Sequence, residues 1–348
     1  MGSFTVTVIM LFFTAGVWPD TFPEQEKQPE PKQPPYYRIM FYNVENLFDT
    51  RDNPHTDDDL FTPAGGMHWT YKRYKAKLTN ICKVLVAAGG WQPPDVIGFC
   101  EVENDSVLMD LFENTLLSKY QYNIVHYDSP DRRGIDVALA YNRHRVERLY
   151  SRNIRVSRDD LRTRDILYMK ALLGGDTCHI FINHWPSRSS GQLDTERDRL
   201  VAAGLLRQAT DSILMQNAAA KILIMGDFND EPGDESLAVK LNARVNRERP
   251  LLAGLYNLAA GEQVQGTLKY QGAWNVFDQV IVSSGILNDT AGIYVKPDGF
   301  TILDNRFLLE PDVTYTGYKP FRTYSGYIYK GGFSDHLPVY VDVFGGKE

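Results

Sequence analysis

Polar side chains that could bind a metal ion or move a proton stand at the ends of apolar segments. They are Asn43, Glu101, His184, Asp227, Asn229, Asp335 and His336. Each residue alone has an ordinary structural explanation, such as a turn cap, a surface ion pair or a satisfied core histidine. Their shared position at segment ends indicates one site at the edge of a sheet, where loops on a rigid scaffold carry function.

The residue types in this set favour hydrolysis assisted by a hard metal ion. The sequence contains no GxxxxGK[ST] loop, no GxGxxG turn after a strand, no GxSxG elbow and no HExxH helix. These absences disfavour nucleotide-dependent transfer, dinucleotide redox chemistry and the commonest serine-hydrolase and zinc-protease mechanisms. The remaining donors are carboxylate and carboxamide oxygens, which suit Mg²⁺, with Mn²⁺ or Ca²⁺ as substitutes.

The spacing within the motifs predicts how these side chains are aimed. Asp227 and Asn229 are two residues apart, so in extended chain they point to one side. Asp335 and His336 are adjacent, and a regular strand would send them to opposite faces, so we expect irregular chain there. Asp278 lies inside an apolar strand, where an unpartnered carboxylate is costly. We expect His336 to be its partner.

Alternating strand-like and helical segments must position these residues. The sequence predicts strands at 37–44, 94–102, 134–141, 166–173, 179–183, 221–226, 276–282 and 337–343. One apolar stripe predicts a helix around Leu78–Val86, and 193–215 is a second helical segment. Gly174-Gly175-Asp176 predicts a hairpin turn. The mixture of hairpins and helical connections indicates a layered α/β or α+β architecture.

Composition restricts the class of protein, and the N-terminal region indicates where the folded domain begins. With 37 Lys+Arg against 44 Asp+Glu, the net charge of −7 disfavours general coating of nucleic acid or anionic membrane, although it does not exclude one cationic groove.

The apolar run at 4–17 is too short to span a bilayer, so we expect residues 1–18 to be a signal peptide and the protein to be exported, to the periplasm or the medium. No Lys or Arg precedes the run, which leaves a cytoplasmic location as the alternative. Six prolines predict a disordered linker at 19–35, before a catalytic domain at 36–348.

An ordered set of motifs resembles the endonuclease/exonuclease/phosphatase superfamily, which includes pancreatic-type deoxyribonucleases, abasic-site endonucleases, inositol-polyphosphate phosphatases and neutral sphingomyelinases. The motifs are FYNVEN at 41–46, Glu101, RGID at 133–136, NHWP at 183–186, GDFN at 226–229, FDQV at 277–280 and SDHLPV at 334–339. The resemblance spans about residues 36 to 345. It implies a four-layered α/β (α+β) sandwich, with two mainly antiparallel β-sheets packed face to face and helices on the outside.

The resemblance also implies a metal site. Glu101 is the expected principal Mg²⁺ ligand, assisted by Asn43 and Asp335. The metal would polarise a phosphoryl oxygen and stabilise the leaving oxygen.

It further implies catalytic roles for the remaining residues. Asp227 would orient or deprotonate the attacking water, and Asn229 would donate a hydrogen bond to the phosphate. His184 and His336, the latter held by Asp278, would place donors on phosphate oxygens where negative charge grows. The sequence leaves open whether His336 is instead the general base, because a histidine near its usual pKa can serve either way.

Three further residues have two interpretations each. Arg133 precedes a strand and could fork onto a phosphate, or it could be a solvated loop arginine. Asp136 is either functional or the partner of Arg133. Trp185 either lines the substrate cleft, together with Arg188, or belongs to the core.

Substrate choice depends on loops, and two segments bear on it. Residues 69–77 combine four cations with three aromatic residues, which suits a nucleic-acid groove or the wet face of a helix. Residues 315–329 carry five tyrosines, which could stack bases or form a hairpin with aromatic cross-strand pairs. We therefore expect a monomeric nuclease without a stable membrane span. The alternatives are a phosphatase or phospholipase-like enzyme acting on small phosphoesters or lipid headgroups, and a catalytically silent binding module.

Overall fold

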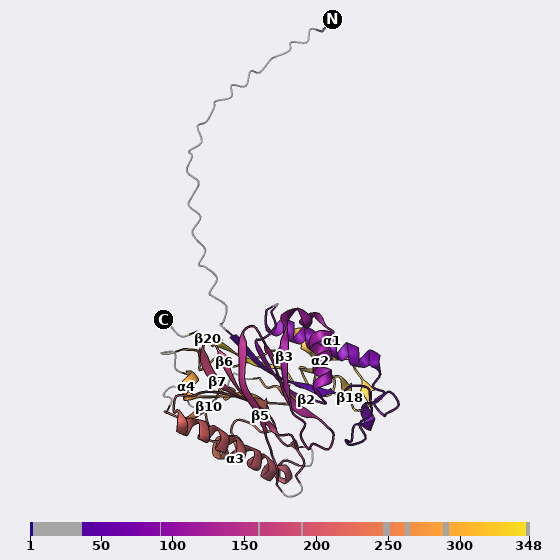
Figure 1. Cartoon of the computed structure of the whole chain (residues 1–348). Helices are drawn as coiled ribbons and strands as arrows, with labels where there is room; N and C mark the ends of the chain where they lie inside the picture. The colour runs from indigo at the N-terminus through magenta and orange to yellow at the C-terminus, as the bar shows by residue number, and fades with distance from the viewer. Residues whose placement is uncertain are drawn as a thin grey trace. The chain divides into compact units, whose positions relative to one another are not determined.

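A computed structural model of the chain describes residues 1–2, 37–90, 92–158, 161–188, 191–245, 251–261, 265–287 and 292–345 (Figure 1). Apart from residues 1–2, the expected signal peptide and linker lie outside the described residues. The chain divides into two compact units, Met1–Pro34 and Pro35–Glu348, and every helix and strand named below belongs to the second. In the described parts of the chain, no helix is long and apolar enough to cross a membrane.

Two seven-stranded sheets form the centre of this unit. The first has the order β14 (Tyr294–Val295), β20 (Val339–Phe344), β1 (Tyr37–Leu47), β2 (Val96–Val102), β4 (Asp136–Asn142) and β3 (Tyr122–His126), with β15 (Thr301–Ile302) also beside β20. The second has the order β5 (Val146–Ile154), β6 (Ile166–Leu173), β7 (Asp176–His184), β8 (Lys221–Asp227), β13 (Asp278–Ser283), β10 (Leu255–Asn257) and β9 (Ala243–Arg244). Only the pairs β1/β2, β7/β8 and β9/β10 among these strands are parallel.

Helices and short hairpins surround the sheets. The helices are α1 (Tyr71–Ala88), α2 (Asp105–Glu113), α3 (Gln192–Gln216) and α4 (Ser284–Leu287). The hairpins pair β11 (Leu268–Tyr270) with β12 (Ala273–Asn275), β16 (Leu309–Pro311) with β17 (Tyr318–Pro320), and β18 (Tyr324–Ser325) with β19 (Ile328–Tyr329). The last pair sets Tyr324 opposite Tyr329, which confirms an aromatic cross-strand pair in the tyrosine-rich segment.

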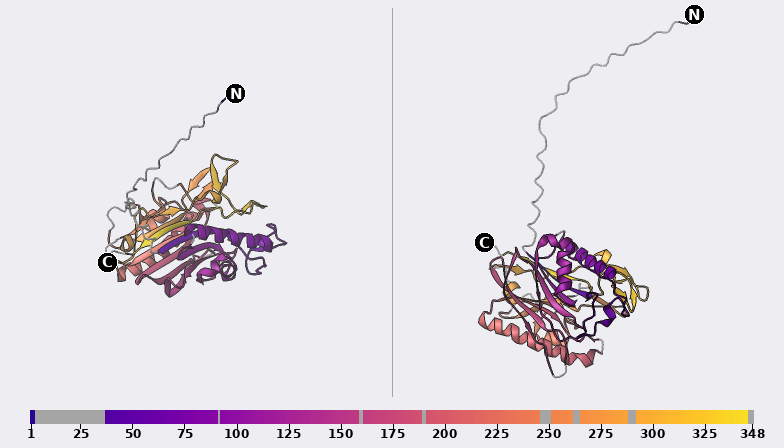
Figure 2. Two further views of the ribbon diagram at one scale, coloured as in Figure 1. Left: turned by 90° about the horizontal axis from the view of Figure 1, so that it is seen from above. Right: turned by 45° about the vertical axis from the view of Figure 1, so that its right-hand side comes forward.

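The sheets pack face to face and carry helices on their outer faces (Figures 1 and 2). Alternating side chains explain this arrangement, because Phe41 of β1 and Ile180 of β7 point into the core between the sheets. Met40 points the other way, into a cluster with α1 and α2, and Phe181 points toward α3. The layers are thus helix, sheet, sheet, helix, which confirms the expected four-layered α/β (α+β) sandwich.

All eight predicted strands are present, with ends within three residues of those expected, and the two predicted helices correspond to α1 and α3. Among the helices and strands named above, the pattern missed β3, β5 and α2, together with α4 and the short strands β9–β12 and β14–β17. Strand β5 lies at the edge of its sheet, and its residues Glu147–Tyr150 are exposed, so it has no apolar run to reveal it. Helix α2 is short and is defined by its N-cap, where the Asn104 side chain accepts a hydrogen bond from the Val107 N–H at 3.0 Å.

Only part of the basic stretch at 69–77 lies on a solvent-exposed face of α1. Lys77 is 1% exposed, and its Nζ donates to Thr323 Oγ1 at 2.5 Å and to the Phe333 carbonyl at 2.6 Å. Trp69 is fully buried. The interpretation that Lys77 lies on the solvent-exposed face of the helix is therefore wrong, because its ammonium hydrogen-bonds to a loop far away in the sequence.

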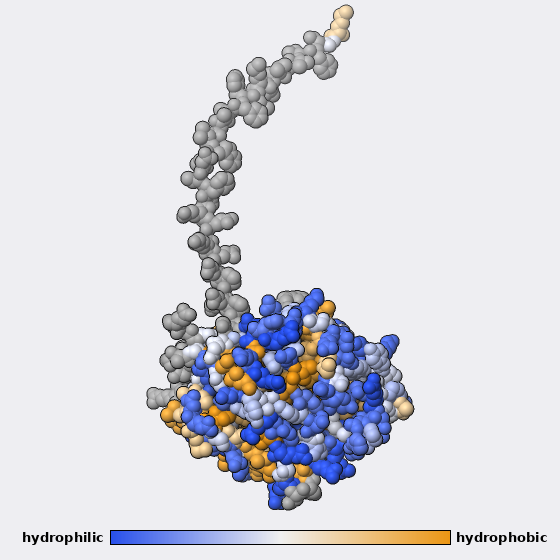
Figure 3. Space-filling view, in the orientation of Figure 1, coloured by the Kyte–Doolittle hydropathy of each residue, from blue (hydrophilic) through white to orange (hydrophobic). Residues whose placement is uncertain are grey.

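The face of the molecule seen in Figure 1 is largely hydrophilic, with small hydrophobic patches between polar regions (Figure 3). Exposed apolar side chains include Leu149 and Tyr150 on β5. Scattered apolar groups of this kind are normal on protein surfaces and require no covering partner.

Gly226 allows β7 and β8 to approach closely at the end of the second sheet. It is the register partner of Asn183, and a Cβ atom at Gly226 would stand 2.5 Å from the Asn183 carbonyl oxygen. Since that distance is far below van der Waals contact, any side chain there must push the two strands apart.

We therefore expect Gly226→Ala to lower the free energy of unfolding by about 1–3 kcal/mol. Urea unfolding followed by circular dichroism measures this. Gly233→Ala is the matched control, because a Cβ there meets nothing within 4 Å. A Gly226→Ala midpoint equal to that of the control would contradict the steric argument.

Candidate active site

The predicted site residues come from strand ends in both sheets. Because β1 and β2 are parallel, Asn43 and Glu101 lie side by side in the first sheet. The parallel pair β7/β8 sets His184 opposite Asp227 in the second sheet. Strand β13 runs antiparallel to β8, with Asp278 as the register partner of Asp227. The topology alone thus brings these five residues to one edge of the sandwich.

Glu101 occupies a strained position at an irregularity in β2. Its φ is +61°, and the pairing of β2 with β4 shifts register between Cys100 and Val102. A positive φ is uncommon for a residue with a side chain, and a bulge of this kind re-aims the side chain. Glu101 Oε2 accepts a hydrogen bond from the Asn46 N–H at 2.9 Å. The backbone therefore fixes this carboxylate at the sheet edge.

Asn43 connects the acids of the two sheets. Its Nδ2 donates to Asp227 Oδ2 at 3.1 Å and lies 3.5 Å from Glu101 Oε1. Its Oδ1 accepts from the Glu45 N–H at 2.9 Å. The amide is thus held from its own strand while it spans the gap between the sheets.

Two imidazoles approach the same oxygen of Asp227. Nε2 of His184 is 3.7 Å and Nε2 of His336 is 3.8 Å from Asp227 Oδ2. His184 Nε2 is also 4.0 Å from Glu101 Oε1. The structure therefore brings together residues that are far apart in the sequence.

The expected contact between His336 and Asp278 is present. His336 Nδ1 lies 2.7 Å from Asp278 Oδ2, and both residues are buried. His336 stands on irregular chain before β20, as its adjacency to Asp335 predicted. The buried carboxylate thus holds the imidazole with Nε2 directed toward Asp227.

The two histidines have opposite pKa shifts. Burial, together with the positive charge of Arg164, puts the pKa of His184 well below its usual value. Burial also disfavours the charged form of His336, but the carboxylates of Asp278 and Asp227 outweigh it and raise its pKa well above the usual value. At neutral pH His184 is therefore neutral and His336 is positively charged.

Asp227 titrates near neutrality. Burial raises its pKa to about 7; the His336 charge opposes the shift, and the nearby Asp278 carboxylate adds to it. Its Oδ1 accepts a hydrogen bond from the Asn229 N–H at 3.0 Å, across a turn in which Asn229 has a φ of +51°. A carboxyl group with such a pKa can accept or release a proton at neutral pH.

A hydrogen bond between Asn229 and Trp185 connects the segment that follows β8 to the segment that follows β7. Asn229 Nδ2 donates to the Trp185 carbonyl at 3.0 Å. Trp185 is 1% exposed and its Nε1 donates to Asn183 Oδ1 at 3.2 Å, which places it in the core. Arg188 forms ion pairs with Asp230 and Asp234. The cleft-lining interpretation of Trp185 is therefore wrong.

Arg133 and Asp136 do not contact each other. Arg133 has a side chain 45% exposed, with Nε 3.4 Å from Asp131 Oδ1. Asp136 Oδ2 instead lies 3.0 Å from His126 Nε2, so the interpretation of Asp136 as the partner of Arg133 is wrong. Sequence reasoning missed the buried Arg164, which donates to Asp131 Oδ2 at 3.0 Å and to the Trp185 carbonyl at 2.7 Å.

Asp335 lies in a charge network with residues that were not singled out from the sequence. Its Oδ2 accepts from Arg322 Nη2 at 2.9 Å, and Arg322 Nε lies 3.4 Å from Glu45 Oε1. Glu45 also accepts from the Thr323 N–H at 2.6 Å. The available signal was Glu45 within the FYNVEN motif, whereas nothing local marks Arg322 as its partner.

The donors around Asp227 fit a hard divalent cation. Three groups of described residues have ligand atoms within 4.8 Å of one another, and the two that contain Asp227 are Asp227–Asp278–His336 and Cys100–His184–Asp227. Burial raises the pKa of the Cys100 thiol well above its usual value, so it stays protonated and leaves oxygen and imidazole donors. Glu101 Oε1 has a long 3.5 Å contact with Asn43, and Asp278 Oδ1 is buried with no hydrogen-bond partner among the described residues. These oxygens suit a cation of the Mg²⁺, Mn²⁺ or Ca²⁺ type.

Solved structures of known proteins share this fold. The chain superposes on a humanised D. rerio TDP2 carrying 14 mutations with a TM-score of 0.55 at 16% identity, covering 88% of this chain and 98% of that one. For the human Nocturnin catalytic domain with bound sulfate the TM-score is 0.51 at 18% identity, covering 89% and 94%. For a mannosyl-6-phosphatase of Bacteroides thetaiotaomicron it is 0.55 at 15% identity, covering 88% and 99%. At these identities the likeness establishes the fold alone.

Sequence comparison supplies the family. None of the curated proteins matches this sequence. The model of the Endonuclease/Exonuclease/phosphatase family matches residues 38–344, which include every candidate site residue described above. The chain therefore belongs to the endonuclease/exonuclease/phosphatase family of phosphoesterases.

Proposed function

We propose that this protein is a Mg²⁺-dependent phosphodiesterase with nucleic acid as its substrate. One observation carries the proposal: a carboxyl group that titrates near neutrality, Asp227, lies within 4 Å of one neutral and one charged imidazole, His184 and His336. A proton acceptor beside two hydrogen-bond donors is the arrangement that hydrolysis of a phosphoester requires. Membership of the family supports a hydrolase.

Glu101, Asn43 and Asp335 are the proposed Mg²⁺ ligands. Bound Mg²⁺ would polarise a phosphoryl oxygen and stabilise the leaving oxygen. Glu101 is supported by its fixed carboxylate, and Asn43 by its position between Glu101 and Asp227. Asp335 is held by Arg322 and would ligate the ion with its remaining lone pairs.

Side chains of the protein would accept the proton of the attacking water and donate hydrogen bonds to the phosphate oxygens. Asp227 Oδ2 would take a proton from the attacking water, which Asn43 Nδ2 helps to orient. Charged His336 would donate from Nε2 to a non-bridging phosphate oxygen, and neutral His184 would do the same where its Nε2 carries the hydrogen. Asn229 has a second amide hydrogen for the phosphate. The exposed guanidinium of Arg133 is the proposed outer phosphate contact.

The tyrosine-rich segment supports nucleic acid as the substrate. Tyr315, Tyr318 and Tyr327 are 46%, 44% and 68% exposed. The segment joins the site through Arg322, which bonds to Asp335. Exposed aromatic rings near a phosphoesterase site can stack bases of a single strand.

A second candidate is a phosphatase or phospholipase-like enzyme acting on small phosphoesters or headgroups. The observation in its favour is that two cations of the 69–77 stretch serve the fold. Lys77 is buried, and Arg73 Nη1 donates to the carbonyls of Met67 and His68 at 2.6 and 2.8 Å. Fewer free cations provide a weaker groove for a polyanion.

We expect His336→Ala to lower kcat at least about a hundredfold on the preferred substrate, because a donor to the developing charge is lost. His144→Ala, a histidine on the exposed surface, is the matched control and should retain full activity. Assays with Mg²⁺ or EDTA on plasmid DNA, single-stranded DNA, RNA, a bis-aryl phosphodiester and an aryl phosphomonoester measure this.

The pattern across these substrates separates the candidates. Turnover of the monoester alone would replace the nuclease with a phosphatase. No metal-dependent turnover on any of them would contradict both and leave a silent binding module.

We expect Glu101→Gln to raise the Mg²⁺ concentration for half-maximal activity at least about tenfold, because a neutral amide binds a hard cation less tightly than a carboxylate. Activity titrated with Mg²⁺ measures the change. Glu147→Gln, at an exposed position on β5, is the control. An unchanged titration in Glu101→Gln would remove this residue from the metal site.

A further inference from the structure

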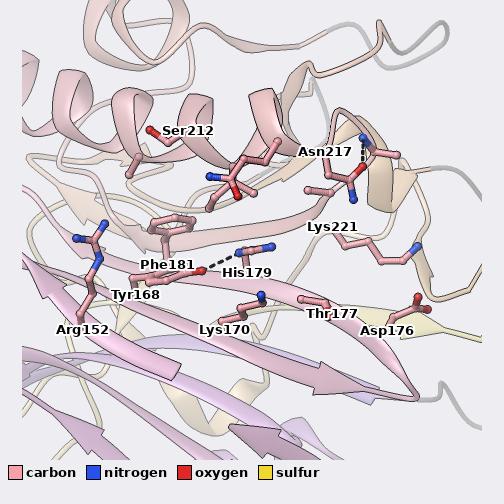
Figure 4. Close-up of a pocket in the computed structure, with 15 residues that line it drawn as sticks. Arg152, Tyr168, Lys170, Asp176, Thr177, His179, Phe181, Ser212, Asn217 and Lys221 are labelled. Carbon is pink, nitrogen blue, oxygen red and sulfur yellow. Dashed lines mark hydrogen bonds between the residues drawn. The ribbon is translucent and has the colours of Figure 1, made fainter. Parts of the chain in front are cut away.

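A pocket lies between α3 and the outer face of the second sheet (Figure 4). Its volume is about 630 Å³, within the range that accommodates a small organic ligand. Its walls come from β5, β6, β7, the start of β8 and the C-terminal half of α3. None of the candidate active-site residues lines it.

Side-chain alternation in β7 produces this pocket. Cys178 and Ile180 point into the core between the sheets, so Thr177, His179 and Phe181 face α3. Opposite them α3 presents the small side chains of Ala209 and Ser212, which leave space above the sheet. The pocket therefore follows from the sequence of both elements.

The pocket carries an excess of positive charge. Arg152 and Lys170 line it against the single carboxylate of Asp176, and Lys221, which has a partner of its own, lines it as well. Among the described residues, neither Lys170 nor Arg152 forms an ion pair with a carboxylate. Asp176 accepts a hydrogen bond from the Ile293 N–H at 2.6 Å. Clustered cations repel one another, and Lys170 is half-buried, so an anion in the pocket would relieve this repulsion.

His179 adds a neutral donor and an aromatic wall. Its Nδ1 lies 2.8 Å from the Tyr168 hydroxyl, and its ring stacks with that of Tyr168 at a centroid distance of 6.0 Å. Burial, together with the charge of Lys170, lowers the pKa of His179 to about 4. With the hydroxyl donating to Nδ1, Nε2 carries the ring hydrogen and points away from Tyr168 (Figure 4).

We propose that this pocket binds the phosphate group of a small, ring-bearing phosphomonoester. Lys170 and His179 are register partners, and a tetrahedral dianion can accept from an ammonium and an imidazole N–H together, whereas a planar carboxylate has fewer acceptor sites. The rings of Tyr168 and Phe181 offer an aromatic surface against which the ring of the ligand can pack, and the pocket volume is large enough to hold it. Along β7, His179 in the pocket is five residues from His184, a separation of roughly 17 Å. The two sites are therefore distinct.

Titration of histidine-labelled protein with phenyl phosphate, followed by NMR in EDTA, tests the proposal. The His179 ring signals, assigned with His179→Gln, should shift saturably, and EDTA prevents metal-dependent turnover of the probe. Lys170→Gln should weaken binding at least about tenfold, since hydrogen bonds to charged groups are among the strongest. Lys170→Arg should retain binding, and Lys83→Gln, on the exposed face of α1, should bind as the unaltered protein does.

Separate outcomes would overturn each part of the proposal. No saturable shift of the His179 signals, or equal affinity in Lys170→Gln, would remove the anion site. Tighter binding of benzoate than of phenyl phosphate would refute the assignment to phosphate. Equal binding of inorganic phosphate and phenyl phosphate would refute the role of the ring.

Discussion

Two buried carboxylates stand opposite each other where β8 pairs with β13, and the architecture of the candidate site depends on this register. Asp227 and Asp278 are register partners, and their exposed fractions are 2% and 0% respectively. Two ionised carboxylates so close in a medium of low dielectric repel each other strongly, so a positive charge must stand beside them. The imidazolium of His336 supplies it, and a divalent cation would add to it. Burial raises the pKa of Asp227, with the Asp278 charge adding to the shift, and the two carboxylates raise the pKa of His336.

The fold provides this arrangement through strand direction. Parallel pairing of β1 with β2 and of β7 with β8 carries Asn43, Glu101, His184 and Asp227 to strand ends at one edge. Strained backbone at Glu101 then turns its carboxylate to the gap between the sheets. Because a packed core determines these positions, the strain is maintained by the surrounding sandwich. Rigid strands thus hold groups that a flexible loop would leave too far apart.

Local pattern was sufficient to predict eight of the strands and the convergence of polar strand ends. The partnership of Asp278 with His336 also followed, since a buried carboxylate needs a cation and few histidines exist. The network of Lys77, Glu45 and Arg322 did not follow, because each contact joins residues hundreds of positions apart with no local signature. The prediction that Lys77 faces solvent was wrong for the same reason. Its place in α1 suggested an exposed ammonium, and the hydrogen bond to the distant Phe333 carbonyl is visible only in the structure.

The place of β20 in the first sheet has a consequence for synthesis of the protein. This strand pairs with β1, although the ribosome makes it long after β1 has emerged. Until it arrives, β1 has one open edge with unsatisfied backbone groups, and the loop bearing His336 is missing as well. The nascent chain is thus vulnerable to strand-to-strand association until residues 339–344 have been made, and the candidate site can be completed only when β20 docks.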